Sequence, residues 1–193
     1  MSVKPLLDAW RDYVSLRDEP QAREWFDGFD WALSERNLVP QTKPVLTHLQ
    51  NAVSSAGRAE SRLAQELQNC VDQLEWRQSY TADDFGQGFV DNYAHVQLIG
   101  PQGHFASDEL AGGLVLYGPG LDYRDHWHVA EEIYIPLTPG AHWSQDREDH
   151  VERGAGAFIY HTSNMPHAIK TSNTPLLALW AWSGGDLTQK GNY

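Results

Sequence analysis

The stretch that decides the fold is GLDYRDHWHVAEEIYIP, residues 120–136, which carries two histidines, a glutamate and a tyrosine in alternating positions. Alternate side chains on an extended strand share a face, so His126 points the same way as His128, and Glu132 the same way as Tyr134. If a short turn folds the two pieces together, these side chains converge. Two imidazoles and a carboxylate suit a divalent ion, which the spacing therefore predicts.

Residues around this stretch extend the prediction. A third imidazole is available at His167, where Pro166 fixes the preceding backbone and a further strand is expected to begin. On the face opposite the ligands we expect Trp127, Ile133 and Ile135 to pack into the core. The remaining histidines lack such neighbours and are expected to be surface or hydrogen-bonded structural residues: His48, His95, His104, His142, His150 and His161.

The spacing of apolar residues along the chain changes near residue 80. Residues 1–80 repeat apolar positions at helical spacing, whereas residues 81–193 show short apolar or alternating runs broken by Gly and Pro. Helices are predicted near 4–18, 20–35, 43–54 and 57–78, and strands near 93–99, 112–117, 130–137, 155–160 and 175–182. This pattern predicts a mainly β fold, a small antiparallel barrel or sandwich in residues 81–193, with an N-terminal helical region packed on it.

Composition excludes several classes of protein. The chain has 193 residues, enough for one domain or for one domain with an additional helical region. Its formal charge of −12 argues against binding a phosphate backbone. The single cysteine, Cys70, excludes a disulfide framework and a Cys-based zinc site. Eight of the nine histidines and −9 of the charge fall in residues 81–193, so we expect the chemistry there.

No segment of the sequence predicts membrane contact or export. The first residues include Asp8, Arg11 and Asp12, where a signal peptide needs an unbroken apolar run. The longest apolar run, 176–182, is too short to span a bilayer. We therefore expect a cytoplasmic protein.

The quoted motif resembles the first cupin motif, which here reads Gly120, His126, His128, Glu132 and Gly140, with seven residues rather than six before the last glycine. The second cupin motif departs more, because its usual Pro-x-Gly-x-x-His is shortened to Pro166-His167.

A narrower resemblance rests on HWHxAEExYxxL, on the helical N-terminal region and on the chain length. In these features the sequence resembles the cupin-type dimethylsulfoniopropionate lyases, and among them the short Q-type enzymes of marine bacteria. It implies a single-cupin barrel and cleavage of dimethylsulfoniopropionate to dimethyl sulfide and acrylate.

The resemblance also implies a ligand set. Carried over to this chain, the ligands to one metal ion are His128, Glu132, Tyr134 and His167, with His126 as a further ligand or a close neighbour. Fe(II) or Zn is the expected ion, and Mn, Co or Ni would also suit these ligands.

The chemistry of β-elimination suggests further roles. A base must remove the proton next to the substrate carboxylate, and a phenol can do so when a metal lowers its pKa from about 10. Tyr134, on the ligand face, is the first candidate, and Tyr123 is the second, as base or proton relay. Aromatic faces attract a sulfonium cation. Those expected near the substrate are Tyr117, Tyr123, Tyr160, Trp180 and Trp182.

Two other functions stay open at this point. The same ligands would serve an Fe(II) dioxygenase, although an oxygenase has no need of a phenolic base such as Tyr134 beside its carboxylate ligand. A non-catalytic, metal-dependent small-molecule binding module is the other. The helical region could cover one end of the barrel or form a homodimer contact. The resemblance implies a small zwitterionic sulfonium substrate as the partner. The acidic composition argues against a nucleic acid, and the short apolar runs argue against a membrane.

Overall fold

The structure, a computed structural model, describes residues 2–193, so Met1 of the predicted helical region lies outside it. Short helices fill the first half of the chain. They are α1 (Lys4–Val14), α2 (Pro20–Phe26), η1 (Pro44–His48), α3 (Leu49–Ser55), α4 (Ser61–Asn69), η2 (Val71–Gln73), α5 (Ala82–Phe85) and α6 (Gln87–Asp91). Within residues 2–193 no helix is both long and apolar enough to cross a membrane.

The second half is built of strands. They are β1 (Tyr93–Gly100), β2 (Phe105–Ala106), β3 (Leu110–Tyr117), β4 (Asp122–His126), β5 (Glu131–Pro136), β6 (Ala141–Gln145), β7 (Val151–Arg153), β8 (Ile159–His161), β9 (His167–Thr171) and β10 (Leu176–Ser183). A larger sheet has the order β2-β1-β3-β10-β5-β8, and a smaller one the order β4-β9-β6-β7. The mainly β fold is therefore confirmed, as two sheets that do not close into a continuous barrel.

The larger sheet separates two cores, because its strands alternate between two buried faces. Ile133 and Ile135 of β5 belong to a core shared with the helices, as predicted for these two side chains. Tyr134 of β5 and Trp180 of β10 belong to a second core, which side chains of the smaller sheet complete. The space between the two sheets therefore receives every second side chain of β5 and β10.

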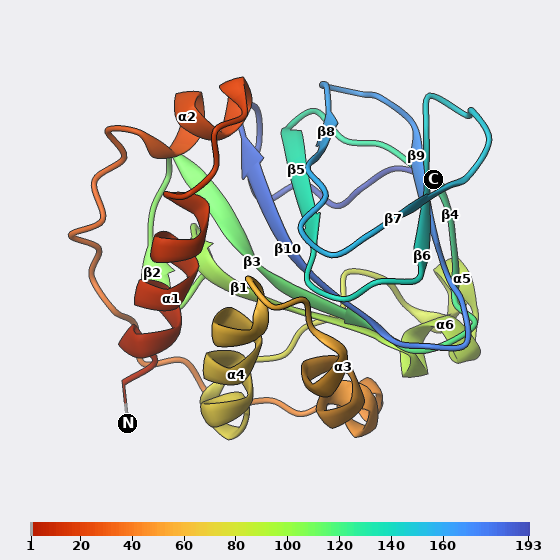
Figure 1. The fold of residues 1–193 in the computed structure, drawn as a ribbon, viewed down its shortest axis with the longest axis horizontal. Helices are drawn as coiled ribbons and strands as arrows, with labels where there is room; N and C mark the ends of the chain where they lie inside the picture. Colours follow the sequence, from red (N-terminus) through yellow and green to blue (C-terminus); the bar gives the residue numbers. More distant parts are fainter. Residues whose placement is uncertain (1) are drawn as a thin grey trace.

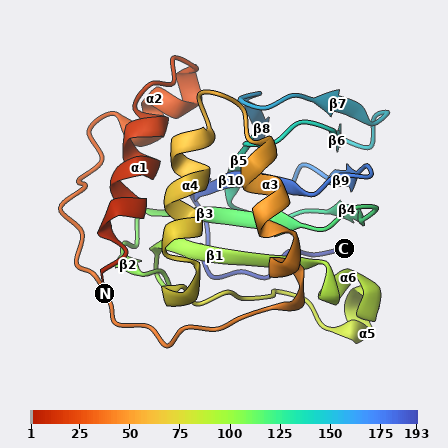
Figure 2. The same cartoon turned by 60° about the horizontal axis from the view of Figure 1, so that its bottom comes forward.

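Helices α1, α3 and α4 lie side by side over the larger sheet (Figures 1 and 2). Trp10 of α1 is fully buried and its indole nitrogen lies 3.3 Å from the carbonyl oxygen of Gly113 on β3. A Cβ on the neighbouring Gly112 would lie 3.1 Å from Cζ2 of Trp10, so the glycine at position 112 leaves room for the large ring. Because the first core contains both helical and strand residues, helices and sheet stabilise each other. The division of the chain near residue 80 stays a prediction.

Two of the predicted helices were much too long, and two short helices were not predicted. The helix predicted at 20–35 ends at Phe26, because Gly28 adopts a φ of 88° and the chain continues irregularly. The helix predicted at 57–78 is α4 followed by one 3-10 turn. Helices α5 and α6 fall in the part expected to be strands. Pro20 and Pro44 do begin their helices, as predicted.

Trp127 corrects another expectation. Its backbone pairs with that of Asn192 near the C-terminal end, through hydrogen bonds of 3.0 and 2.8 Å. Its side chain is half-buried and belongs to neither core. The alternation predicted for the motif nevertheless holds, because the flanking His126 and His128 are buried while Val129 is exposed.

Candidate metal centre and aromatic cavity

Three neighbouring strands carry the middle of the site. β5 lies between β10 and β8, and Glu132 pairs in register with Trp182 on one side and with His161 on the other. Directly opposed residues on adjacent strands share a face, so the three side chains form one row across the sheet. Tyr134, two residues along β5, lies on the same face.

Two further histidines reach this row from the other side. His167 begins β9, and His128 follows β4. The Nε2 atoms of His128 and His167 lie 3.3 and 3.1 Å from Glu132 Oε2. The ligand atoms of His128, Glu132 and His167 lie within 4.8 Å of one another, and all three residues are buried. They form a set that could share one metal ion.

Backbone carbonyls orient both imidazoles. His128 Nδ1 lies 2.8 Å from the carbonyl oxygen of Ala130, and His167 Nδ1 lies 2.9 Å from that of Met165. A carbonyl oxygen only accepts, so each Nδ1 must carry a proton and donate it. In a neutral ring the Nε2 atom then presents a bare lone pair, as metal-bound histidines do.

This donor set fits a divalent cation. The Nε2 atoms of His128 and His167 are buried and have no hydrogen-bond partner. Two bare lone pairs and a carboxylate oxygen at 3.1–3.3 Å repel one another unless a positive charge lies among them. Burial raises the pKa of Glu132, but the surrounding imidazoles, His128 first, outweigh burial and hold that pKa well below its ordinary value.

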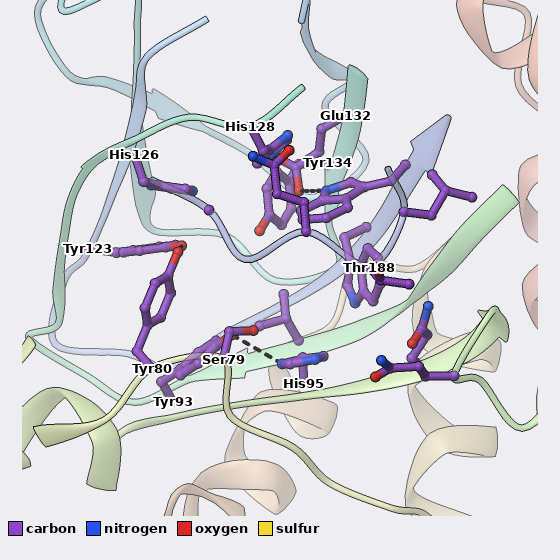
Figure 3. A pocket seen from close by; sticks show the side chains of 18 of the residues that line it. Ser79, Tyr80, Tyr93, His95, Tyr123, His126, His128, Glu132, Tyr134 and Thr188 are labelled. Carbon is purple, nitrogen blue, oxygen red and sulfur yellow. Dashed lines mark hydrogen bonds and ion pairs between the residues drawn. The ribbon is translucent and has the colours of Figure 1, made fainter. Parts of the chain in front are cut away.

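A cavity of 130 Å³ adjoins the centre, a size that suits a small molecule. His128 and Glu132 line it, and tyrosines and tryptophans form much of the remaining wall. Figure 3 shows Glu132, His128 and Tyr134 at one side of the cavity and Tyr80, Tyr93 and His95 at the other. Predicted residues Tyr117, Tyr123, Trp180 and Trp182 also lie on this wall.

The two candidate bases differ in their surroundings. The Tyr134 hydroxyl lies beside the Tyr117 hydroxyl, at 3.4 Å, and burial together with the Glu132 charge raises the pKa of Tyr134 well above its usual value. Tyr123 stacks on His126 with ring centroids 3.7 Å apart, and its hydroxyl lies 2.7 Å from that of Tyr80. Burial also raises the pKa of Tyr123 well above its usual value.

His126 and Tyr160 stand apart from the ligand set. The ring of His126 lies 4.0 Å from that of His167, but no His126 atom belongs to the group that could share an ion. Tyr160 corrects the substrate-binding prediction. Strand alternation turns it away from the cavity, on the face opposite His161, where its ring lies 6.2 Å from that of Trp25.

Sequence reasoning missed several residues that meet here. His161, expected to be a surface or structural residue, is fully buried, and its Nδ1 lies 3.3 Å from Glu132 Oε2. Burial lowers the pKa of His161 to about 4, which leaves the ring neutral at pH 7. His95 and Tyr93 line the cavity, as does Tyr80 from the end of the helical region. The sequence did contain a signal for His161. In the short run Ile159-Tyr160-His161, strand alternation places His161 on the same face as the apolar Ile159.

The second motif is more regular than the sequence indicated. Asn164 stands three residues before His167, where the cupin pattern has its glycine, and adopts a φ of 60°. Asparagine tolerates this left-handed conformation better than most residues. Asn164 therefore makes a left-handed turn at this position, three residues before His167.

A family model described as dimethylsulfoniopropionate lyase matches residues 21–178. Two curated relatives share this description. Dimethylsulfoniopropionate lyase DddQ of Ruegeria pomeroyi is 39% identical over 110 residues, which are 57% of this chain and 55% of that protein. The putative dimethylsulfoniopropionate lyase DddL of Cereibacter sphaeroides is 31% identical over 157 residues, 79% of this chain and 65% of that protein. The matched part is thus under two thirds of either relative.

Two solved structures resemble the whole chain. A chain from the crystal structures of the lyases RdDddP and RnDddQII superposes with a TM-score of 0.89 at 29% identity, covering 98% of this chain and 96% of that one. The crystal structure of DddQ from Ruegeria pomeroyi DSS-3 gives a TM-score of 0.86 at 28% identity, covering 98% and 94%. The overall fold of this chain is therefore shared with both solved structures.

Proposed function

Because the chain belongs to the dimethylsulfoniopropionate lyase family, we propose that it is a carbon–sulfur lyase that converts dimethylsulfoniopropionate to dimethyl sulfide and acrylate. The observation that carries the proposal is the cluster of His128, Glu132 and His167, which meets an aromatic cavity through two of its members. Such a cavity matches a small zwitterion that has a carboxylate at one end and a sulfonium at the other.

The ion would be held by His128, Glu132 and His167, with Tyr134 as a fourth ligand by family resemblance. Fe(II) or Zn is the proposed metal, with Mn, Co and Ni as alternatives. When bound, the divalent ion would supply positive charge that anchors the substrate carboxylate and favours the ionised form of a neighbouring phenol.

Tyr134 is the proposed base. It would remove the proton from the carbon next to the carboxylate. The electron pair of that C–H bond would form the new carbon–carbon double bond, and the pair of the C–S bond would leave with sulfur. The leaving group is neutral dimethyl sulfide, so no strong acid is needed. Tyr134 supports this role because it lies next to Glu132 on the cavity wall.

Tyr123 is the second candidate, as base or relay. Its hydroxyl has the Tyr80 hydroxyl as a partner at 2.7 Å, which gives a proton a path between the two phenols. Tyr134 is preferred because it shares β5 with Glu132, whereas Tyr123 belongs to β4 and stacks on His126, which lies outside the ligand set.

Aromatic rings would receive the sulfonium. Tyr117, Trp180 and Trp182 line the cavity, and each face can contribute roughly 0.5–2 kcal/mol toward a cation. Among the lining side chains that the structure describes, none is an arginine or a lysine that would repel the sulfonium. The carboxylate would accordingly depend on the metal for its anchor.

A headspace assay tests the proposed function. Purified protein loaded with a single metal is mixed with dimethylsulfoniopropionate under nitrogen, and both dimethyl sulfide and acrylate are measured. We expect equal amounts of the two products without oxygen. Activity only in the presence of oxygen would indicate a dioxygenase, and binding without products would indicate a sensor.

A further inference from the structure

His161 occupies a position that the ligand set does not explain. It lies directly opposite Glu132 across the β5–β8 ladder, and its side chain is fully buried. Its Nδ1 is 3.3 Å from Glu132 Oε2, while its Nε2 is buried without a hydrogen-bond partner. A neutral imidazole has one N–H, and the only hydrogen-bond partner that the structure gives this ring is the Glu132 carboxylate, on the Nδ1 side.

Glu132 therefore has a neighbour on each flanking strand. The indole N–H of Trp182 on β10 donates to Oε1 at 2.6 Å, and His161 on β8 faces Oε2. Neighbours on opposite sides restrict rotation of the carboxylate about its final bond. Oε2, the oxygen that His161 approaches, also faces the Nε2 atoms of His128 and His167.

His161 lies behind Glu132 rather than among the ligands. It is absent from the group of atoms that could share one ion, although it approaches the same carboxylate oxygen. Its ring stacks on that of His167 with centroids 4.0 Å apart and an interplanar angle of 16°. One side chain thus contacts two of the three ligand residues from outside.

We propose that His161 is a positioning residue for the metal centre, which donates its Nδ1–H to Glu132 Oε2 and, together with Trp182, fixes the carboxylate for metal binding. The proposal rests on the metal centre of the proposed function and does not depend on the reaction. Partners of ligating carboxylates typically affect metal affinity by roughly 10- to 100-fold.

Three variants separate the hydrogen bond from packing. His161→Phe keeps a ring for stacking and removes the donor. His161→Asn places an amide N–H near the position of Nδ1, whereas His161→Gln places one near Nε2, which has no partner. Each variant is purified metal-free, checked by circular dichroism and thermal unfolding, and titrated with Zn²⁺ against a chelator of known affinity.

The expected order of Zn²⁺ affinity is wild type, then Asn, then Gln and Phe, with the Phe variant weakened roughly 10- to 100-fold. The visible absorption spectrum of the Co²⁺-loaded protein should change in the Phe variant and return toward wild type in the Asn variant. Tyr160→Phe is the matched control, because this neighbour on β8 points away from the cavity and should leave Zn²⁺ affinity unchanged.

Unchanged affinity in the Phe variant, or equal losses in all three variants, would overturn the proposal. Complete loss of Zn²⁺ in all three would also overturn it, because His161 would then be a ligand itself. If the Phe variant does not fold, the comparison of Asn with Gln decides. Since no sulfonium substrate is used, a failed lyase assay leaves this result intact, and the two failures are distinguishable.

Discussion

The indole nitrogen of Trp182 lies 2.6 Å from Glu132 Oε1, and these two residues face each other in the β10–β5 ladder. The ring also lies 4.2 Å from that of His128, centroid to centroid. Trp182, expected from the sequence to bind substrate through its aromatic face, is therefore also a hydrogen-bond donor to the central carboxylate. The two roles can be separated by substitution.

Trp182→Phe should weaken Zn²⁺ binding by roughly 10-fold, since it removes the N–H donor to Glu132 but retains an aromatic face. Isothermal titration of the metal-free protein measures this. Trp180→Phe is the matched control, because the Trp180 indole nitrogen has no hydrogen-bond partner. Equal Zn²⁺ affinity for Trp182→Phe and wild type would show that the hydrogen bond does not position the carboxylate.

Tyr134→Phe should lower kcat by roughly 10²- to 10⁴-fold, the usual contribution of a general base. The protein should still bind metal through His128, Glu132 and His167. Dimethyl sulfide release and metal content are measured on the same preparation. Tyr123→Phe should lose less activity. If Tyr134→Phe retains most of its activity and Tyr123→Phe loses it, Tyr123 rather than Tyr134 is the base.

Removal of the metal should abolish turnover. Without a cation, burial and the Glu132 charge keep the pKa of Tyr134 well above its ordinary value, so almost no phenolate forms near neutral pH. Protein treated with a chelator is reloaded separately with Fe(II), Zn, Mn, Co or Ni and assayed. Restoration by at least one ion is expected. Full activity in protein verified to contain no metal would contradict the proposed chemistry.

Acid should destabilise the fold through His95. Burial lowers the pKa of His95 to about 4 from 6.5, so the unfolded chain binds a proton that the folded protein does not. The stabilising contribution is therefore complete above pH 6.5 and is lost as the pH falls toward 4. The slope is up to about 1.4 kcal/mol per pH unit.

Urea unfolding of the metal-free protein between pH 7 and 4 measures this slope. His95→Asn should show a shallower loss of unfolding free energy over the same range. Tyr93→Phe, which removes the hydroxyl 3.1 Å from His95 Nδ1, leaves the buried imidazole in place and should keep most of the wild-type slope. If the unfolding free energies of wild type and His95→Asn fall in parallel as the pH is lowered, His95 is not the source of the acid destabilisation.

The motif predicted the strand and the ligand positions on it because alternation along a strand fixes which side chains share a face. Alternation over 120–136 puts Glu132 and Tyr134 on one face of β5 and Ile133 on the other, as observed. The assignment to the dimethylsulfoniopropionate lyase family is confirmed by the family match, and the mainly β fold is shared with a solved lyase structure. His128, Glu132 and His167 converge as expected, while the roles of Tyr134 and the cavity aromatics stay predictions.

The sequence could not predict contacts that depend on strand order. His161 meets Glu132 only because β8 is the neighbour of β5, and Tyr80 reaches Tyr123 only because the end of the helical region returns to the cavity. Tyr160 illustrates the opposite error, because proximity to a lining strand says nothing about the face. The irregular segment after Phe26 kept helical spacing of apolar residues, but Gly28 ended the helix.

The product ratio of the metal-loaded wild-type protein under nitrogen is the most direct test of the proposed lyase reaction. Dimethyl sulfide in the headspace and acrylate in solution are quantified from one sample of dimethylsulfoniopropionate, with Tyr134→Phe run in parallel. We expect equal amounts of both products from the wild type and a loss of roughly 10²-fold or more in the variant. No dimethyl sulfide from protein that carries its metal would contradict it.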